Sequence, residues 1–215
     1  MEEDLFRYPA MLNLKNKRCT VIGGGKVALR KTRTLLAAGA AMVTVISPAA
    51  DENLTVLAAE GKINLLLRGY QPGDVNGSFL VIAATDNAEL NRTIAADAPC
   101  LVNVVTEPEL GNFSVPAHSA SGRLTFTAFG GGLPAFTALL ARDIAKIYGN
   151  DFAGFADFLH EARLDLQKLN LTPKERTAFW RSQLTGEAIG LLHEGRLNTL
   201  KERITDAIDS FRVKS

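Results

Sequence analysis

The stretch Arg18-Cys-Thr-Val-Ile-Gly-Gly-Gly-Lys-Val-Ala-Leu-Arg-Lys31 decides the fold of this chain. A β-rich run, residues 19–22, stops at a cluster of glycines and continues directly into the helix-forming residues 27–38. Two of the glycines and Ala28 form a G-x-G-x-x-A pattern between a predicted strand and a predicted helix, as in dinucleotide-binding βαβ units. The pattern therefore favours dinucleotide binding over a plain structural turn, which the same glycines would also serve.

Each small residue of this pattern has a physical role. Gly23 lets the chain turn sharply away from the strand. Gly25 has no Cβ, so a pyrophosphate can approach the backbone there, and Ala28 allows the helix to pack closely on the sheet. The first N–H groups of the helix have no intrahelical partner and lie at its positive end. An anion such as a pyrophosphate suits this arrangement.

Composition indicates a globular protein of average charge. The chain has 215 residues, of which 47% are hydrophobic and 22% charged, with a formal net charge of +1. We therefore expect neither nucleic acid nor membrane as a partner, and no window approaches the ~20 apolar residues of a membrane span. The N-terminus lacks a secretory pattern, and Cys19 and Cys100 are expected to be reduced residues of buried strands. These features predict a cytoplasmic protein, and no metal site is expected.

Apolar strands alternate with helices as far as Val105. The first helix is expected at 26–38, closed by Gly39, and a second at 51–60. Further strands are expected at 42–46, 63–67, 79–84 and 101–105, with a third helix ending near residue 97. Continuous apolar strands are typical of a parallel sheet that is buried on both faces. The alternation therefore predicts an α/β fold with a Rossmann-type, doubly wound parallel sheet.

The pattern changes after this alternation. Segments 113–116 and 123–129 alternate loosely without an intervening helix, and Pro134 precedes a helix expected at 135–148. Beyond residue 151 only helices are indicated, including one that begins at Thr172-Pro173 and one at 197–211. We predict an NAD-binding Rossmann domain at 1–112, a small α+β dimerisation domain at 113–149 and a helical C-terminal domain at 150–215.

Three further segments follow the carboxyl ends of predicted strands, where a sheet of this kind binds its ligand. They are Ser47-Pro48-Ala49, Thr85-Asp86-Asn87 and Asn103-Val104-Val105-Thr106. The acidic residue that usually binds the adenosine ribose would close the second strand, where Ser47 stands, and Asp51 and Glu52 come slightly too late. No arginine follows to bind a 2′-phosphate, so the sequence favours NAD over NADP without deciding between them.

The runs GGGKVALRKTRTLLAAGA, FLVIAATDNAELN and LVNVVTEPELGNFSVPA resemble the N-terminal module of siroheme synthase and the free-standing precorrin-2 dehydrogenases. The resemblance covers about residues 8–148 and continues weakly through 174–184. It implies an oxidoreductase of siroheme and porphyrin biosynthesis that oxidises precorrin-2 to sirohydrochlorin with NAD. Some members of the family also insert ferrous iron, and the family combines a Rossmann domain, a dimerisation domain and a helical domain.

The resemblance also implies site residues, position by position. The cofactor-binding residues would be Gly23, Gly24, Gly25, Lys26, Val27 and Ser47, with Pro48 and Ala49 flanking the adenosine, and Thr85, Asp86 and Asn103 lining the nicotinamide side. Where the family has N-V-V-D, with an aspartate thought to act in dehydrogenation and chelation, this sequence has Thr106. A threonine hydroxyl cannot serve as a carboxylate base near neutral pH. The family's Ser/Thr-Gly-Gly-x-Ser-Pro loop is replaced at 129–134 by Phe-Gly-Gly-Gly-Leu-Pro, without either serine.

Thr106, Glu107 and His118 are the candidates to surround the reacting centre. Glu107 either substitutes for the missing aspartate or, as we prefer, is a solvated loop carboxylate. His118 either binds iron or transfers a proton, but a surface histidine is the preferred interpretation. His160 and His193 have no metal-ligand spacing and are expected to be structural. Two alternatives to an active dehydrogenase stay open: a weakened homologue that still binds NAD and tetrapyrrole, and a nicotinamide-sensing regulatory domain unrelated to tetrapyrroles.

The apolar face of the predicted dimerisation domain indicates a homodimer. A strand at 124–129 and a helix carrying Phe136, Leu139, Leu140 and Ile144 at helical spacing present apolar surface. This segment is too small to make a core of its own. Two copies packed about a two-fold axis would cover the surface, as the resemblance also implies.

Overall fold

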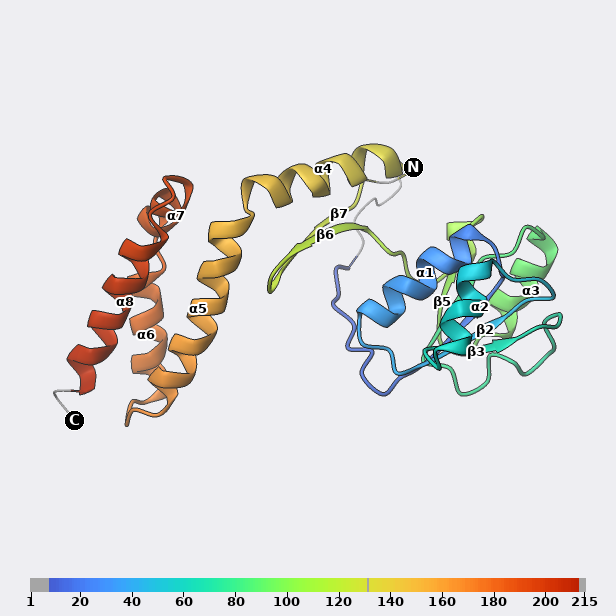
Figure 1. Ribbon diagram of the computed structural model, residues 1–215, viewed down its shortest axis with the longest axis horizontal. Coiled ribbons are helices and arrows are strands. Elements are labelled where there is room, and N and C mark those ends of the chain that lie inside the picture. The colour runs from blue at the N-terminus through green and yellow to red at the C-terminus, as the bar shows by residue number, and fades with distance from the viewer. Residues whose placement is uncertain (1–7, 131, 213–215) are drawn as a thin grey trace. The chain divides into compact units, whose positions relative to one another are not determined.

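The computed structural model describes residues 8–130 and 132–212, and the chain divides into two compact units. The first unit ends at Val115 and the second begins at Pro116. The first unit contains β1 (Arg18–Ile22), α1 (Lys26–Ala37), β2 (Met42–Ile46), α2 (Glu52–Ala59), β3 (Asn64–Leu66), β4 (Leu80–Ala83), α3 (Ala88–Asp97), β5 (Leu101–Val104) and the short 3-10 helix η1 (Pro108–Leu110) (Figure 1).

The strands of the first unit form one parallel sheet in the order β3-β2-β1-β4-β5. In this register Cys19 of β1 pairs with Val43 of β2 on one side and with Leu80 of β4 on the other. The winding direction therefore reverses between β1 and β4, which makes the ends of these strands the topological switch point. The predicted Rossmann-type doubly wound α/β fold is confirmed.

Two hydrophobic clusters cover the two faces of this sheet, because successive side chains of a strand point to opposite sides. Val21 belongs to the cluster that contains Leu29 of α1 and Leu54 of α2. Ile22, the next residue of β1, belongs to the other cluster, with Ile94 of α3. Both faces of β1 are thus buried, as its continuous apolar sequence predicted.

Local signals set the ends of the helices. Gly39 follows α1 with a positive φ of 83°, the left-handed conformation that ends many helices. Asp51 caps α2 by accepting a hydrogen bond from the Asn53 backbone N–H at 2.9 Å. Asn87 caps α3 in the same way, accepting from the Leu90 N–H at 3.0 Å. Each cap satisfies a backbone donor that the helix itself leaves unpaired.

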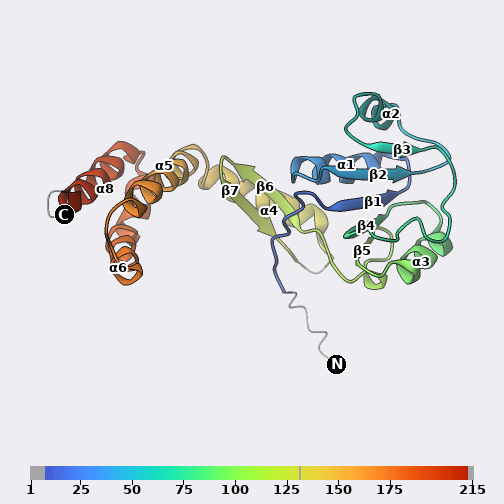
Figure 2. The same ribbon diagram turned by 90° about the horizontal axis from the view of Figure 1, so that it is seen from below.

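The second unit pairs an antiparallel hairpin with helices. It contains β6 (Ala117–Ser121), β7 (Leu124–Ala128), α4 (Pro134–Ile147), α5 (Asn150–Gln167), α6 (Pro173–Gln183), α7 (Gly186–His193) and α8 (Leu197–Arg212). The hairpin of β6 and β7 lies against α4 (Figure 2). The helices α5 to α8 enclose a separate cluster around Leu166, Leu200 and Ile204. Trp180 and the phenylalanines at 152, 155 and 158 belong to that cluster or pack against it.

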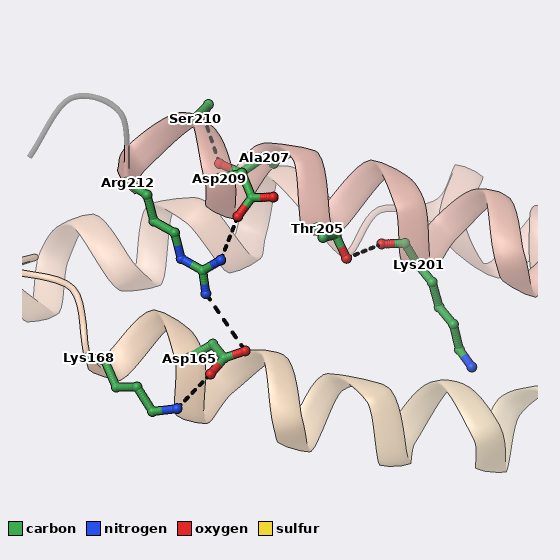
Figure 3. Close-up of polar contacts among 8 residues, drawn as sticks. All are labelled: Asp165, Lys168, Lys201, Thr205, Ala207, Asp209, Ser210 and Arg212. Carbon is green, nitrogen blue, oxygen red and sulfur yellow. Dashed lines mark hydrogen bonds and ion pairs between the residues drawn. The ribbon is translucent and has the colours of Figure 1, made fainter.

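One ion pair connects the ends of α5 and α8, with a local pair beside it on each helix (Figure 3). Asp165 of α5 accepts from Lys168 at 2.8 Å and lies 3.9 Å from Arg212 of α8, which also pairs with Asp209 at 2.7 Å. The hydrogen bond from Lys168, together with the two cations, holds the pKa of Asp165 below its ordinary value. Because these side chains are 44–74% exposed, the pairs contribute little to stability compared with the apolar cluster beneath them.

Some local expectations were wrong. Residues 113–116 are in no strand, and the strand instead begins at Ala117. Phe113 packs on the first unit, where its carbonyl accepts from the Asn103 side chain at 3.2 Å. Cys100 precedes β5 and is only half-buried, whereas Cys19 lies in β1, where burial, with a smaller effect of Cys100, raises its thiol pKa to about 11.

Helix α7 has no counterpart among the expected elements. Gly186 and Gly190 weaken its helical pattern, although Ala188, Leu191 and Leu192 are buried. Helix α6, by contrast, begins at the Thr172-Pro173 start that the sequence indicated, with a reciprocal Thr172–Glu175 capping box. Within the described ranges, no helix has both the length and the apolar character needed to cross a bilayer.

Candidate functional site

Two glycines after β1 are packed against the backbone of neighbouring loops. Gly23 has a φ of +125°, and a Cβ added there would lie 2.4 Å from the carbonyl oxygen of Ala84. A Cβ on Gly24 would lie 1.9 Å from the carbonyl oxygen of Ala49 and 2.7 Å from Oγ of Ser47. Any larger residue would force these loops apart, so glycine is required at both positions by packing within the protein itself.

Gly25 differs from them, because its missing Cβ faces open space. A Cβ added there would meet no atom within 4 Å, and its φ of −84° is accessible to any residue. Gly25 is also the N-cap residue of α1, where no side chain caps the helix and the first turn contains no acidic residue. The free N–H groups of that turn and the absent side chain fit the pyrophosphate of a dinucleotide.

The loop after β2 lies beside these glycines. Ser47 is buried beneath Gly24, while Pro48 and Ala49 are exposed. The Asp51 N–H donates to the carbonyl of Gly24 at 2.7 Å, which joins this loop to the glycine loop. Hydrogen bonds from the side chain and then the backbone of Asn53 lower the pKa of Asp51. Its carboxylate is thus engaged in capping α2, consistent with the expectation that it comes too late to bind a ribose.

A buried amide joins the loops that follow β4 and β5. The side chain of Asn91, in the first turns of α3, is fully buried. Its Oδ1 accepts from the Thr85 hydroxyl at 2.7 Å and from the Thr85 N–H at 3.3 Å. Its Nδ2 donates to the Thr85 carbonyl and to Oγ1 of Thr106, both at 3.1 Å. Thr106, at the position of the family aspartate, is therefore held by a hydrogen bond that it accepts.

Glu107 is not the solvated carboxylate that the sequence suggested. Its side chain is only 21% exposed, and Oε2 pairs with Arg92 of α3 at 2.7 Å. Its other oxygen, Oε1, is buried and has no hydrogen-bond partner in the part of the chain that the structure describes. A carboxylate oxygen in that condition retains the capacity to accept a hydrogen bond or a proton.

The remaining sequence-predicted residues divide between the two units. Asn103 is buried in β5, whereas Lys26, Val27 and Asp86 are exposed beside the glycine loop and after β4. His118 belongs to β6 of the second unit and is exposed, with Nδ1 3.3 Å from the carbonyl of Pro116. The segment 129–134 that replaces the family's serine loop contains Gly131, which lies outside the described residues.

The structure thus brings most predicted residues of the first unit to the carboxyl edge of the sheet, since the loops after β1, β2, β4 and β5 meet there. Sequence reasoning missed Asn91 as a site residue. The available signal was an asparagine one turn before Ile94 on the buried face of a helix, where an apolar residue is the rule. In the described residues, no cluster of three or more potential metal ligands is found.

Comparison with known proteins agrees with this geometry. Residues 10–117, just over half of the chain, match a family model described as putative NAD(P)-binding. The chain belongs to this NAD(P)-binding family. The matched span includes the whole parallel sheet and every candidate residue from Gly23 to Glu107. It ends one residue before His118.

Related proteins extend the similarity beyond the Rossmann unit. The chain is 34% identical over 207 residues to the siroheme synthase of Thioalkalivibrio sulfidiphilus, covering 94% of this chain and 42% of that protein. It is 38% identical over 186 residues to the siroheme synthase of Pseudomonas putida, covering 83% and 39%. The chain therefore spans about two fifths of the length of these curated relatives.

A solved structure shares the fold. The structure named SirC, precorrin-2 dehydrogenase, superposes with a TM-score of 0.77 over 93% of this chain and 100% of that chain, at 23% sequence identity. The fold of 93% of the chain is thus that of a known protein. The sequence similarity to the siroheme synthases confirms the family resemblance drawn from the sequence, and this structural match shows a shared fold.

Proposed function

We propose that this chain catalyses the NAD-dependent oxidation of precorrin-2 to sirohydrochlorin in the cytoplasm, as a step of siroheme biosynthesis. The observation that carries the proposal is the alignment of 94% of the chain with a siroheme synthase. The vacant space at Gly25, at the uncapped start of α1, supports it, because a bound pyrophosphate would occupy such a space. NAD is preferred to NADP because no arginine follows Ser47 in the loop after β2, although Arg33 of α1 donates to Asn53 at the start of α2 at 3.2 Å.

The oxidation removes two hydrogens from the tetrapyrrole, one as hydride and one as a proton. Bound NAD would supply the hydride acceptor. The role of this chain would be to orient both molecules, with Gly23 to Val27 and Ser47 to Ala49 holding the dinucleotide and Thr85, Asp86 and Asn103 facing the nicotinamide. The rigid, hydrogen-bonded loops after β4 and β5 support such an orienting role.

The departing proton requires a base, and Thr106 cannot be that base near neutral pH. Glu107 is one candidate, because its Oε1 has no partner among the described residues while Arg92 holds Oε2 at 2.7 Å. That oxygen is buried, so substrate binding would have to expose it before it could accept the proton. His118 is the other candidate that the sequence offers. We therefore propose that Thr106 binds and orients, and that Glu107 or His118 accepts the proton.

The test is an anaerobic assay with reduced precorrin-2 and NAD, followed by the absorbance of sirohydrochlorin and NADH. We expect one NADH for each sirohydrochlorin formed. A parallel reaction with ferrous iron and sirohydrochlorin tests iron insertion. Absence of NADH formation with intact substrate, from protein that binds NADH, would refute the dehydrogenase.

A second candidate function is a weakened homologue that binds NAD and a tetrapyrrole without oxidising it. It is supported by the threonine at the position of the family aspartate, tied to Asn91 at 3.1 Å. This candidate predicts binding of NADH and of sirohydrochlorin but no turnover. Measurable turnover in the anaerobic assay would reject it.

We also propose three domains, at 1–112, 113–149 and 150–215, and a homodimer centred on α4. The division is supported by the separate apolar cluster of α5 to α8, which includes no residue of the hairpin or of α4. The dimer is supported by large exposed side chains on α4: Phe136, Leu139 and Leu140 are 59%, 57% and 39% exposed. Such residues normally need a partner, and a stable dimer of this kind buries about 2,000 Å² or more.

A further inference from the structure

We infer that Asn91 is the positioning residue of the proposed dinucleotide site, fixing the loops after β4 and β5 relative to each other. This inference rests on the proposed function, because the loops concerned are those proposed to line the nicotinamide. Asn91 itself is fully buried, so it acts through Thr85 and Thr106 and not by touching a ligand. None of the site residues predicted from the sequence was expected to connect these two loops.

The amide of Asn91 uses its whole hydrogen-bonding capacity on these two residues. Oδ1 accepts twice from Thr85, at 2.7 and 3.3 Å, and Nδ2 donates to the Thr85 carbonyl and the Thr106 hydroxyl at 3.1 Å. An amide rotated by half a turn would place donors against the Thr85 N–H, so the network admits one orientation. Thr85 follows β4 and Thr106 follows β5, and the two strands are hydrogen-bonded neighbours.

The arrangement determines what the Thr106 hydroxyl can do. Its oxygen accepts from Asn91, and its hydrogen is donated to no other group of the described residues. The hydroxyl hydrogen of this exposed residue is therefore available for donation to a ligand. Arg92, the next residue of α3, holds Glu107 in the same manner at 2.7 Å, so consecutive residues of one helix hold consecutive residues of one loop. A residue needed only for packing beside Ile94 would be apolar, because a buried amide is costly unless fully bonded.

The test replaces the amide by a carboxyl in Asn91→Asp. When protonated, the introduced carboxyl still donates one hydrogen bond. When ionised it donates none, and it faces the Thr85 carbonyl with a negative charge. Burial raises the pKa of such a group, so ionisation occurs as the pH rises above the ordinary value of about 3.9. Binding of NADH, followed by its fluorescence between about pH 5 and 8, should weaken roughly tenfold in the variant and stay constant in the wild type.

Asn112→Asp is the matched control. The Asn112 amide also makes two hydrogen bonds to backbone, accepting from the Val102 N–H and donating to the Cys100 carbonyl, both at 2.8 Å. These bonds lie at the opposite, amino end of β5, away from the proposed site. The control should leave the pH dependence of NADH binding unchanged. Amide hydrogen exchange of the unliganded proteins adds a readout without a ligand: exchange should accelerate in the loops after β4 and β5, which contain Thr85 and Thr106, in Asn91→Asp only.

The outcomes are separable. Equal NADH affinity of wild type and Asn91→Asp at every pH would overturn the inference, as would faster exchange spread evenly over the sheet. A wild type that does not bind NADH would refute the proposed function itself, and this role with it. Should Asn91→Asp fail to fold, Thr106→Val removes only one of the four bonds, at an exposed residue. It should weaken NADH binding by about threefold or more, and unchanged binding there would count against positioning.

Discussion

The glycine loop offers a matched pair of substitutions with opposite expected effects. In Gly24→Ala the new Cβ would lie 1.9 Å from the Ala49 carbonyl oxygen and 2.7 Å from Ser47 Oγ, so backbone has to move. Overpacking of this kind costs about 1–3 kcal/mol. In Gly25→Ala the new methyl would meet no protein atom within 4 Å. We expect that change to alter stability by less than about 0.5 kcal/mol, the usual range for exposed positions.

NADH binding should be weakened by Gly25→Ala, the variant whose stability is expected to stay nearly unchanged. The Gly25 methyl would occupy space that the pyrophosphate is proposed to enter, so NADH affinity should fall at least about tenfold, or about 1.4 kcal/mol. Thermal unfolding and NADH titration of both variants measure the two effects. At about 4 °C for each kcal/mol, Gly24→Ala should lower the melting temperature by roughly 4–12 °C. Unchanged affinity in Gly25→Ala, with unchanged stability, would refute the assignment of this loop to phosphate binding.

Three further outcomes are expected. Thr106→Asp, which restores the family carboxylate, should raise precorrin-2 oxidation at least about tenfold in the anaerobic assay; an unchanged rate would show that the base lies elsewhere. Leu140→Glu should give a monomer by light scattering, whereas Leu164→Glu on α5, at a similar exposure of 42% against 39%, should leave the mass unchanged. The Arg68 guanidinium holds the pKa of the Asp74 carboxyl below its ordinary value. This pair therefore stabilises the folded state fully above about pH 3.9, the pKa of an unfolded aspartate. The stabilisation is lost as the pH falls through the lower pKa of Asp74 in the folded state. Asp74→Asn should therefore flatten the pH dependence of unfolding in that acidic window, measured by circular dichroism; an unchanged slope would contradict the assignment.

Much of the first unit was predictable because its information is local. Continuous apolar runs such as Met42–Ile46 mark buried parallel strands, and caps such as Asp51 and Asn87 mark helix starts. The hairpin strand Ala117–Ser121 was missed because its small and polar residues, AHSAS, carry no strong alternation. Strands are thus predictable from local sequence where both faces are buried, because the run of apolar residues is then continuous.

The site was less predictable, because its contacts depend on strand order. Thr85 and Thr106 come together through Asn91 only because β4 and β5 are neighbours in the sheet. Glu107 appeared to be an ordinary loop carboxylate until the fold placed Arg92 beside it. Neither contact has a periodic signature, since the partners lie on different elements. The resemblance supplied the cofactor residues, but no sequence pattern reveals which side chains hold them in place.

The central position of β1 has a consequence for the way this chain is made. Strand β1 emerges from the ribosome before the other strands of its sheet. One of its two edges stays unpaired until Leu80–Ala83 has been synthesised, because Cys19 pairs with both Val43 and Leu80. An unpaired apolar strand is a template for association between chains. Nascent chains that stall between β3 and β4 would present that edge together with one uncovered face of the sheet. Slow translation of residues 67–79 should therefore increase aggregation of this protein in the cell, and a chaperone that binds extended apolar segments should reduce it.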